Sequence, residues 1–523
     1  MRCLMVWPQF PKTFWSFEEV LKLAGRKSLV PPLALTTVAA LLPESWEIKL
    51  VDRNIRSVTD AEWEWSEIVL FSGMIVHRSD MLDQIGIAKT WGKPVVVGGP
   101  YATSVPDDLR AADVDFLVLD EAEITLPMFV QALERGDSSG EFHANGEKPD
   151  VTSTPIPRFD LYELDAYDTM ALQYSRGCPF LCEFCDIITL YGRKPRTKAP
   201  AQMLAELDAL YELGWRRGIL IVDDNFIGNK KNAKMMLREL EKWQQAHGFP
   251  FPFMTEASVD LAADKELMRL MVACNFDSVF LGIETPDEDS LNQTRKYQNV
   301  RNSLTEAVES IIQHGIRPMG GFIIGFDGEK EGAGGRIVEF IELTGIPTAN
   351  FSMLQALPNT ALWDRLKKEG RLLKTDSDIN QTSLTNFVTQ RPIERLAKEY
   401  IEAFAAIYDP LVYLDRVYRC FTKLGPPVKF DKTKLVLPSL LELRALLIII
   451  WRQGVIRNTR WKFWHHSISI LINKTAVLPH YLSVCAQYEH FHGFKDVVRD
   501  EIESQIEVIE CVENEVVVAE NVA

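Results

Sequence analysis

The stretch Ser175-Arg-Gly-Cys178-Pro-Phe-Leu-Cys182-Glu-Phe-Cys185 places three of the chain's eight cysteines within eight residues. Thiolates are soft ligands that suit iron–sulfur clusters, and a [4Fe–4S] cube has four irons to ligate. Three cysteines leave one iron without a protein thiolate, so a substrate or cofactor can bind that iron directly, by the logic of an open catalytic zinc site. The stretch therefore predicts an iron–sulfur cluster with one open iron.

Two plainer interpretations compete with the cluster: a zinc site, or three unrelated buried cysteines. Structural zinc usually needs a fourth Cys or His nearby, which this loop lacks, and the C-x3-C-x2-C spacing is unusual for zinc. The remaining cysteines are scattered along the chain, at Cys3, Cys274, Cys420, Cys485 and Cys511. This distribution argues against a disulfide scaffold and favours a reducing compartment with one local metal site.

The cysteine loop follows the first of six short apolar segments, and predicted helices separate these segments from one another. The expected strands are Met170 to Tyr174, Gly218 to Val222, Pro252 to Thr255, Ser278 to Leu281, Gly321 to Ile324 and Asn350 to Leu354. Six such units predict a partial (β/α)6 barrel, whose functional residues should lie at the carboxyl ends of the strands.

The first part of the chain has a similar alternation with continuous apolar strands. The expected strands are Cys3 to Val6, Glu47 to Val51, Ile68 to Phe71, Pro94 to Val97 and Phe116 to Leu119. Continuous apolar strands indicate a parallel sheet covered on both faces, which is a Rossmann-like arrangement. Small residues end two of these strands, as Ser72-Gly73 and Gly98-Gly99-Pro100, where such sheets bind ligands.

The sequence thus predicts an α/β protein with three folded parts. The expected divisions are a Rossmann-like domain at 1–135, a polar linker at 136–165, the barrel at 166–370, a separate helical C-terminal domain at 371–495, and a partly disordered acidic tail at 496–523.

Composition narrows the class of partner. The formal net charge is −16 and the pI is near 5.2, which argues against a nucleic-acid partner because such proteins carry a basic face. No secretory signal is readable at the N-terminus, and apolar runs such as Ala445 to Trp451 are too short to span a bilayer. We therefore expect a cytoplasmic protein.

At Cys178, Cys182 and Cys185 the chain resembles the radical S-adenosylmethionine (SAM) superfamily, whose signature is C-x3-C-x2-C on the loop after the first barrel strand. The resemblance implies that these cysteines hold a [4Fe–4S] cluster and that SAM chelates the fourth iron. It further implies that an electron from the reduced cluster cleaves SAM to methionine and a 5′-deoxyadenosyl radical. A ferredoxin or flavodoxin is the kind of electron donor expected.

Residues at the later strand ends extend this resemblance and imply the contacts to SAM. Asp224 and Asn225 stand where many members have Gly-Gly-Glu, and Gly282-Ile-Glu284-Thr285 is similar to the ribose-contacting element. The segment from Gly320 to Gly325 is similar to the element that packs against adenine. The implied SAM-binding residues are Asp224, Asn225, Glu256, Ser258, Glu284, Gly321 and Gly325.

A Rossmann-like domain directly ahead of such a barrel resembles the cobalamin-dependent branch of the superfamily. The resemblance implies cobalamin contacts at Ser72, Gly73, Gly98, Gly99, Pro100 and Tyr101. The Asp-x-His-x-x-Gly motif that supplies an axial histidine in other cobalamin proteins is absent, as is common in this branch. His77 is accordingly interpreted as a surface residue or as one that lies behind the site.

Across nearly its whole length the chain resembles the family that includes the hopanoid C-2 methylases, for example in Leu50-Val-Asp52-Arg53-Asn54 and Val222-Asp-Asp-Asn225-Phe. The resemblance implies a C-methyltransferase acting on an unactivated carbon of an apolar, hopanoid-like lipid. The basic and aromatic segment from Leu440 to Ile472 predicts an interfacial helix or a lid over a lipid, and hence peripheral contact with a membrane. An ordinary core helix with snorkelling arginines is the alternative.

Other functions stay open at this point. They are an oxidative cyclase or another B12-dependent radical enzyme acting on a tetrapyrrole or natural product, and a noncatalytic cobalamin sensor. A methylthiotransferase would need a second cysteine trio in the first domain, which has only Cys3. The sequence identifies no catalytic side chain.

Overall fold

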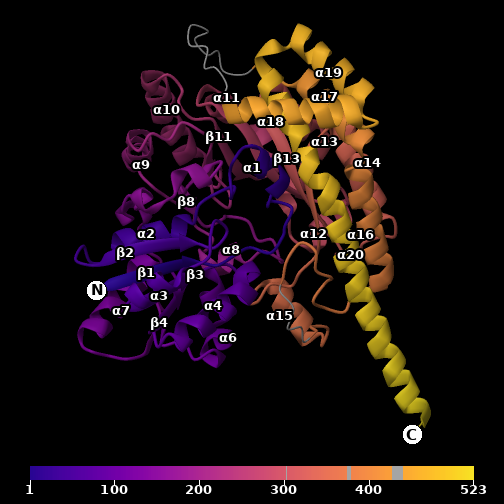
Figure 1. The fold of residues 1–523 in the computed structure, drawn as a ribbon. Helices are drawn as coiled ribbons and strands as arrows, with labels where there is room; N and C mark the ends of the chain where they lie inside the picture. Colours follow the sequence, from indigo (N-terminus) through magenta and orange to yellow (C-terminus); the bar gives the residue numbers. More distant parts are fainter. Residues whose placement is uncertain (302, 374–378, 427–439, 523) are drawn as a thin grey trace.

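The computed structural model describes residues 1–301, 303–373, 379–426 and 440–522, with the backbone alone at 440, 442 and 510–522. Two parallel sheets, each with helices against it, occupy the N-terminal and middle parts of the chain, and helices form the C-terminal part (Figure 1). The expected α/β class and the helical C-terminal part are confirmed.

The first sheet has six parallel strands in the order β2-β1-β3-β4-β5-β6. Its strands are β1 (Arg2–Trp7), β2 (Glu47–Asp52), β3 (Ile68–Ser72), β4 (Val95–Gly98), β5 (Phe116–Val118) and β6 (Gly140–Phe142). The five expected strands are all present. The strand order reverses between β1 and β3, and such a switch point opens a ligand-binding crevice at the carboxyl ends of the strands.

Helices cover both faces of this sheet, which explains why β3 and β4 are continuous apolar runs. One core lies between the sheet and α2 (Leu33–Leu41) and α7 (Ala122–Glu134). The opposite core contains side chains of the helices α3 (Asp60–Trp65), α4 (Arg78–Thr90), α5 (Pro100–Ser104) and α6 (Pro106–Ala111).

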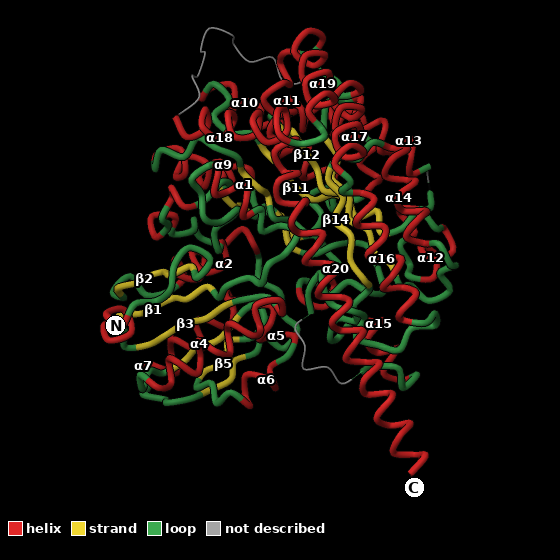
Figure 2. The backbone as a smooth tube through the Cα atoms, turned by 45° about the vertical axis from the view of Figure 1, so that its right-hand side comes forward, coloured by secondary structure: helices red, strands yellow, loops and turns green. Residues whose placement is uncertain are grey.

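The second sheet also has six parallel strands, and they follow chain order from one edge to the other. Figure 2 shows strands of this sheet with helices packed around them. They are β7 (Met170–Leu172), β10 (Ile219–Ile221), β11 (Phe253–Ala257), β12 (Phe276–Glu284), β13 (Arg317–Ile324) and β14 (Thr348–Met353). The intervening helices are α9 (Pro200–Glu212), α10 (Lys230–His247), α11 (Lys265–Ala273), α12 (Glu288–Gln293), α13 (Leu304–Gln313) and α14 (Ala333–Thr344), with α15 (Ala361–Lys368) after β14. The predicted partial (β/α)6 barrel is confirmed.

The segment expected to be a plain linker, 136–165, contains structure that the sequence did not reveal. Strand β6 pairs with the edge strand β5, and short 3-10 turns follow at Val151–Ser153, Phe159–Leu161 and Leu164–Ala166. A three-residue strand beginning with Gly is too short to give a readable pattern, and it exists because β5 offers a free edge for pairing.

The C-terminal helices do not form a separate core, contrary to the expectation. They are α16 (Ile393–Ile407), α17 (Pro410–Lys423), α18 (Leu440–Trp451), the π-helix η7 (Arg452–Ile456), α19 (Arg460–Asn473) and α20 (Leu478–Val522). Their buried side chains belong to the same hydrophobic core as the barrel. The hydroxyls of Tyr400 and Tyr408 donate to the backbone carbonyls of Phe351 (3.0 Å) and Ala349 (2.7 Å) on β14.

Helix α20 continues through the acidic tail, so the backbone expected to be partly disordered is helical up to Val522. It runs past the other C-terminal helices and extends beyond them (Figure 1). Within the described residues, no helix has the length and apolar content needed to cross a membrane.

Candidate active site between the two sheets

The cysteine loop begins in a short antiparallel hairpin of β8 (Ser175–Arg176) and β9 (Arg196–Thr197), and it ends at α8 (Ile187–Leu190). Gly177 has a φ of 91°, and a Cβ at this position would lie 2.7 Å from the carbonyl oxygen of Gly192. Only glycine fits this turn, which lets the backbone N–H of Cys178 donate to Gly192 at 3.2 Å.

The three thiols of the loop are free and partly exposed, whereas Cys3, Cys274, Cys420 and Cys485 are free but buried. Within the part of the chain that the structure describes, no three His, Cys, Asp or Glu side chains converge as they would on a single metal ion. A cube does not need that convergence, because each thiolate binds a different iron.

Nitrogen donors from distant segments surround these sulfurs. Asn225 Nδ2 lies 3.9 Å from Cys178 Sγ, and Gln298 Nε2 lies 3.6 Å from Cys182 Sγ. The buried ammonium of Lys296 interacts electrostatically with Cys182 and with Cys185. Hydrogen bonds and positive charge near cluster sulfurs favour the reduced state, so these groups suit a redox cluster. Sequence reasoning missed Lys296 and Gln298, which follow α12 and belong to no readable motif.

An acidic wall follows strands β10 and β11. Asp223 is buried and accepts hydrogen bonds from the Tyr174 backbone and the Ser175 hydroxyl, both at 2.7 Å. Burial, together with the carboxylates of Asp223 and Asp186, raises the pKa of Asp224 to about 7. Among the described residues, Asp224 Oδ2 is buried without a hydrogen-bond partner. Such an oxygen suits a cationic ligand, and SAM carries both an ammonium and a sulfonium group.

Glu256 and Ser258 stand at the end of β11, close to the same wall. Burial and then the charges of Asp224, Asp223 and Glu284 raise the pKa of Glu256 to about 8. The Glu256 side chain is nevertheless exposed, so its carboxyl group is open to a ligand. Ser258 Oγ lies 3.3 Å from Asn225 Nδ2, which brings the second and third strand ends together beside Cys178.

Glu284 is held in a strained backbone conformation at the end of β12. Its φ is 66°, which costs a residue with a Cβ of the order of 1–3 kcal/mol and persists only where the surroundings enforce it. Its carboxylate forms a buried ion pair with Lys296, and Asn299 Nδ2 donates to the carbonyls of Gly282 and Ile283, both at 3.0 Å. Strain of this kind typically marks a functional position.

The two glycines expected near adenine lie on and after β13. A Cβ at Gly321 would lie 2.8 Å from the Phe280 ring, so the glycine allows that ring to pack against the strand. Gly325 has a φ of 103°, and its N–H donates to Glu329 Oε2 at 3.0 Å. Burial raises the pKa of Glu329 to about 7.

A cavity of about 700 Å³ lies between the carboxyl edges of the two sheets, and mostly apolar side chains line it. Four of the residues expected to contact cobalamin line this cavity: Ser72, Gly98, Gly99 and Pro100. From the barrel side it is lined by Gln173, Asp186, Tyr191 and Asp224, among others. The cavity therefore connects the predicted cobalamin edge with the surroundings of the cysteine loop.

Two of the expected cobalamin residues, Gly73 and Tyr101, stand behind this lining. Tyr101 is fully buried, its N–H donates to the Gly73 carbonyl at 3.0 Å, and its hydroxyl donates to Asp108 at 2.8 Å. His77 is also fully buried, packed between Trp7 and Phe10, and burial lowers its pKa to about 4. The surface option expected from the sequence is therefore wrong for His77. The residue lies behind Trp7 and Phe10, which line the cavity.

The cavity fits a flat, bulky cofactor at the edge of the first sheet. A Cβ at Gly98 would lie 2.8 Å from the Val118 carbonyl oxygen, and one at Gly99 would overlap Ser72 Oγ. Both glycines thus allow the neighbouring strand ends to approach closely, and both contribute to the lining of the cavity without a side chain.

Buried ion pairs join the two sheets beside the cavity. Arg176 binds Glu121 and Glu123 at 2.8 Å each, and Arg196 binds Glu121 at 2.8 Å. Glu121 follows β5, whereas both arginines lie on the hairpin that carries the cysteine loop. These ion pairs fix the loop relative to the first sheet.

Comparisons with known proteins give three family matches and several similar whole chains. The B12 binding domain matches residues 21–130, the radical SAM superfamily matches 172–341, and a domain of unknown function matches 360–504. An uncharacterized methyltransferase of Synechocystis sp. is 63% identical over 97% of this chain and 94% of its own length. The hopanoid C-2 methylase of Rhodopseudomonas palustris is 34% identical over 90% of this chain and 89% of its own length.

A solved structure has a similar fold. The radical S-adenosylmethionine methyltransferase TsrM from Kitasatospora setae, with cobalamin and a [4Fe–4S] cluster bound, aligns with a TM-score of 0.62. The alignment covers 94% of this chain and 99% of TsrM at 14% identity, so the likeness concerns the fold.

Proposed function

Because this chain belongs to the cobalamin-dependent radical SAM methyltransferases, we propose that it methylates an unactivated carbon of an apolar, hopanoid-like lipid. The cofactors of this family are a [4Fe–4S] cluster, SAM and cobalamin. The observation that carries the substrate proposal is the 34% identity to a hopanoid C-2 methylase along nearly the whole of both chains.

The residues at the two sheet edges suggest how the cofactors are held. In this proposal the cluster is bound by Cys178, Cys182 and Cys185. SAM is contacted by Asp224, Asn225, Glu256, Ser258, Glu284, Gly321 and Gly325. Cobalamin lies on Ser72, Gly98, Gly99 and Pro100, with Gly73 and Tyr101 supporting that surface from behind. When bound, these groups supply a carbon radical and a transferable methyl group. A radical is needed because an aliphatic C–H bond is not acidic enough to be deprotonated by a general base.

The chain's own residues position the reactants and exclude water. The acidic wall of Asp223, Asp224 and Glu256 attracts a cationic ligand, and the apolar lining of the cavity keeps water away from reactive species. The ion pairs of Glu121 hold the cysteine loop at a fixed place beside the cobalamin edge. The proposal includes a small electron-transfer protein, such as a ferredoxin or flavodoxin, as the source of electrons.

A hopanoid-like substrate is dissolved in a membrane. We therefore propose that the enzyme works at a membrane surface, as a peripheral protein that touches the bilayer through its C-terminal region.

The test begins with anaerobic reconstitution using iron, sulfide and hydroxocobalamin, followed by reduction and addition of SAM. We expect retained cobalamin, formation of 5′-deoxyadenosine, and a hopanoid product heavier by one methylene unit. Cys182→Ala should abolish deoxyadenosine formation, whereas Cys274→Ala, at a buried cysteine outside the loop, should not.

Different failures point to different alternatives. Deoxyadenosine without a methylated hopanoid, but with a modified tetrapyrrole, would replace the proposed substrate. Retained cobalamin without any SAM cleavage would favour a noncatalytic sensor and overturn the proposed reaction.

A further inference from the structure

The geometry points to a membrane-binding surface: we propose that α18, η7 and α19 together dock on an anionic lipid bilayer. We call this surface the docking face and define it by the exposed apolar side chains Leu447, Trp451, Ile456, Trp461, Leu471 and Ile472. Binding through this face follows from the surface itself, whichever molecule the enzyme methylates.

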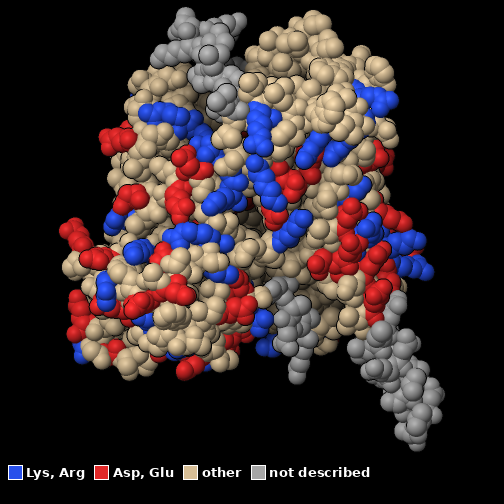
Figure 3. All heavy atoms as spheres, viewed as in Figure 1, with Lys and Arg blue, Asp and Glu red and all other residues tan. Residues whose placement is uncertain are grey.

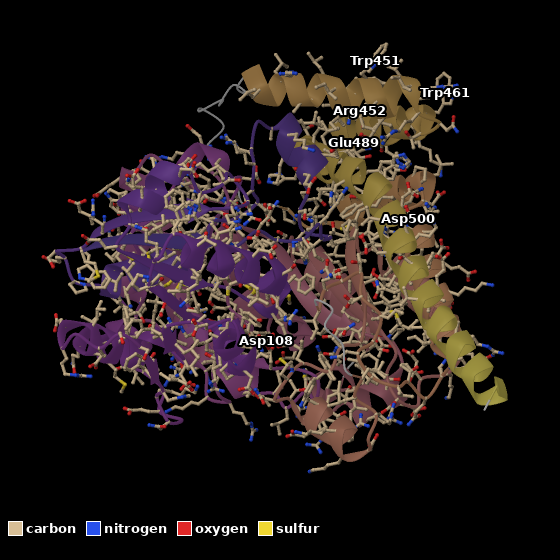
Figure 4. The ribbon with its side chains drawn as sticks, turned by 60° about the horizontal axis from the view of Figure 1, so that its bottom comes forward. Asp108, Trp451, Arg452, Trp461, Glu489 and Asp500 are labelled. Carbon is tan, nitrogen blue, oxygen red and sulfur yellow. The ribbon has the colours of Figure 1, made fainter. Side chains whose placement is uncertain are left out.

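The docking face carries large apolar side chains that are exposed on three consecutive elements. Trp461 is 76% exposed and Trp451 is 58% exposed. Figure 4 shows both rings projecting outward from the end of the molecule, beyond the helices that carry them. Large exposed apolar side chains that gather on neighbouring elements of a folded protein mark an interaction site, and exposed Trp is typical of surfaces that meet the membrane interface.

Charge identifies the partner. Residues 443–488 contain six Lys or Arg and no Asp or Glu, in a chain whose formal net charge is −16. Arg452 and Arg457 are paired with Glu489, and Lys462 is paired with Asp415, so the exposed Arg444 and Arg460 carry the charge that this face offers to a bilayer. In Figure 3, Lys and Arg side chains are visible in the region of α18 and α19, and acidic residues gather elsewhere on this face of the molecule. An anionic bilayer attracts such a segment by about 1 kcal/mol for each basic residue near its surface. Pairing two copies through this face would instead bring like charges together.

The docking face can lie on a bilayer but cannot cross it. Helix α18 has 12 residues and α19 has 14, which correspond to about 18 Å and about 21 Å of helix. Both lengths fall short of the hydrocarbon core, which is about 30 Å thick. Helices of this kind lie in the interface, with apolar side chains among the acyl chains and basic groups at the headgroups.

The inner side of the docking face is fixed to the rest of the protein. Arg452 and Arg457 both bind Glu489 of α20, at 3.0 Å and 2.7 Å, and Glu489 is almost fully buried. Figure 4 shows Arg452 and Glu489 on the inner side of the helices. Gln453 Nε2 donates to the Cys485 carbonyl at 2.8 Å, and Trp464 Nε1 donates to the Gly454 carbonyl at 2.8 Å. The face is therefore rigid before it meets a partner, which lowers the entropic cost of binding.

The position of the docking face suits an enzyme that takes a lipid from the bilayer. Helix α18 packs against α1 (Glu18–Leu23) and against Gly25, where a Cβ would lie 3.2 Å from Leu441. The segment just before α1 contains Trp15, whose ring packs edge-on against Phe280 of β12, 5.5 Å away. Continuous packing therefore joins the docking face to the barrel.

Co-sedimentation of the full chain with lipid vesicles tests the proposal. We expect binding to vesicles of phosphatidylcholine with phosphatidylglycerol, weaker binding to phosphatidylcholine alone, and loss of the difference at high salt. Each of Trp451→Ser and Trp461→Ser should weaken binding roughly tenfold, because each removes a large apolar side chain from the bilayer. Trp91→Ser is the matched control, since Trp91 is 40% exposed at the end of α4 in the first domain, away from the face.

Melting temperatures of the three variants exclude misfolding as the cause. The proposal is overturned if the chain does not bind anionic vesicles, or if the Trp451 and Trp461 variants bind as tightly as wild type. It is also overturned if these variants instead dissociate a dimer in lipid-free solution, because the face would then be an interface between copies.

Methylation assays in detergent separate this proposal from the proposed function. Failure of vesicle binding with intact methylation would remove the docking face and leave the reaction standing. Vesicle binding without methylation of any lipid would leave the docking face standing and remove the proposed methylation of a lipid.

Discussion

The substitution Gly99→Ala tests whether the carboxyl edge of the first sheet is a cradle for cobalamin. Gly99 follows β4 with a φ of 91° and a ψ of −173°, a region that almost only glycine adopts. An alanine there should cost of the order of 1–3 kcal/mol in backbone strain. Its methyl group would also overlap Ser72 Oγ, and this overpacking should destabilise the fold by about a further 1–3 kcal/mol.

Two further variants separate these contributions. Gly136→Ala is the backbone control, because Gly136 has a φ of 87° and its Cβ would meet nothing within 4 Å. The double variant Ser72→Ala/Gly99→Ala removes the overlapping hydroxyl and should recover the overpacking part. A double-mutant cycle should therefore give a favourable coupling of about 1–3 kcal/mol between the two sites.

The assays are denaturant unfolding and the amount of cobalamin retained after desalting. Gly99→Ala should lose most of its cobalamin, the double variant should regain part of it, and Gly136→Ala should retain it like the wild type. Full retention by Gly99→Ala, or zero coupling with Ser72→Ala, would show that this edge is not the cradle described.

Three other predictions follow from buried charges. Glu121→Gln should cost about 3–5 kcal/mol in unfolding experiments because it leaves Arg176 and Arg196 underpaired. Arg110→Gln, which breaks an exposed ion pair, is the control and should leave the unfolding free energy nearly unchanged. Lys296→Met should shift the midpoint potential of the reconstituted cluster to more negative values, by the order of tens of millivolts in an EPR-monitored titration, because a cation near Cys182 is lost. Burial lowers the pKa of His77 to about 4, from about 6.5 in the unfolded chain. Below pH 6.5 the unfolded state therefore binds a proton before the folded state does. The stability that His77 contributes above pH 6.5, about 3 kcal/mol, is lost as the pH falls towards 4. The variant His77→Leu should flatten the pH dependence of unfolding over that window, and an unchanged slope would refute the assignment.

Sequence predicted the two sheets well because their strands are buried on both faces. Runs such as Ile68–Ser72 and Val95–Gly98 have no polar alternation, which indicates a parallel sheet covered by helices. The cysteine loop could be read because all three ligand candidates lie within one short segment. The C-terminal helices showed a helical pattern, but that pattern does not say which surface a helix packs against, so their shared core with the barrel was missed.

The partners of the loop could not be predicted because they come from elsewhere in the chain. Lys296 and Gln298 follow a short helix more than one hundred residues after Cys182, and their approach depends on the fold of the whole barrel. Strand β6 was missed because three residues beginning with Gly carry no strand pattern. The sequence left open whether His77 lies at the surface or behind the site, because a lone histidine gives no sign that Trp7 and Phe10 enclose it.

The contact between the two sheets explains why the chain needs both. In each sheet the loops and small residues gather at the carboxyl edge, so a ligand at one edge is open to solvent unless something covers it. Here each edge covers the other, with the cavity between them, and Glu121 joins them by ion pairs to Arg176 and Arg196. A radical formed beside the cysteine loop would be quenched in an open crevice. In the proposed reaction, facing the two edges across one apolar cavity would keep the radical, the methyl source and the acceptor carbon together away from water, and the ion pairs would fix the separation of the two edges.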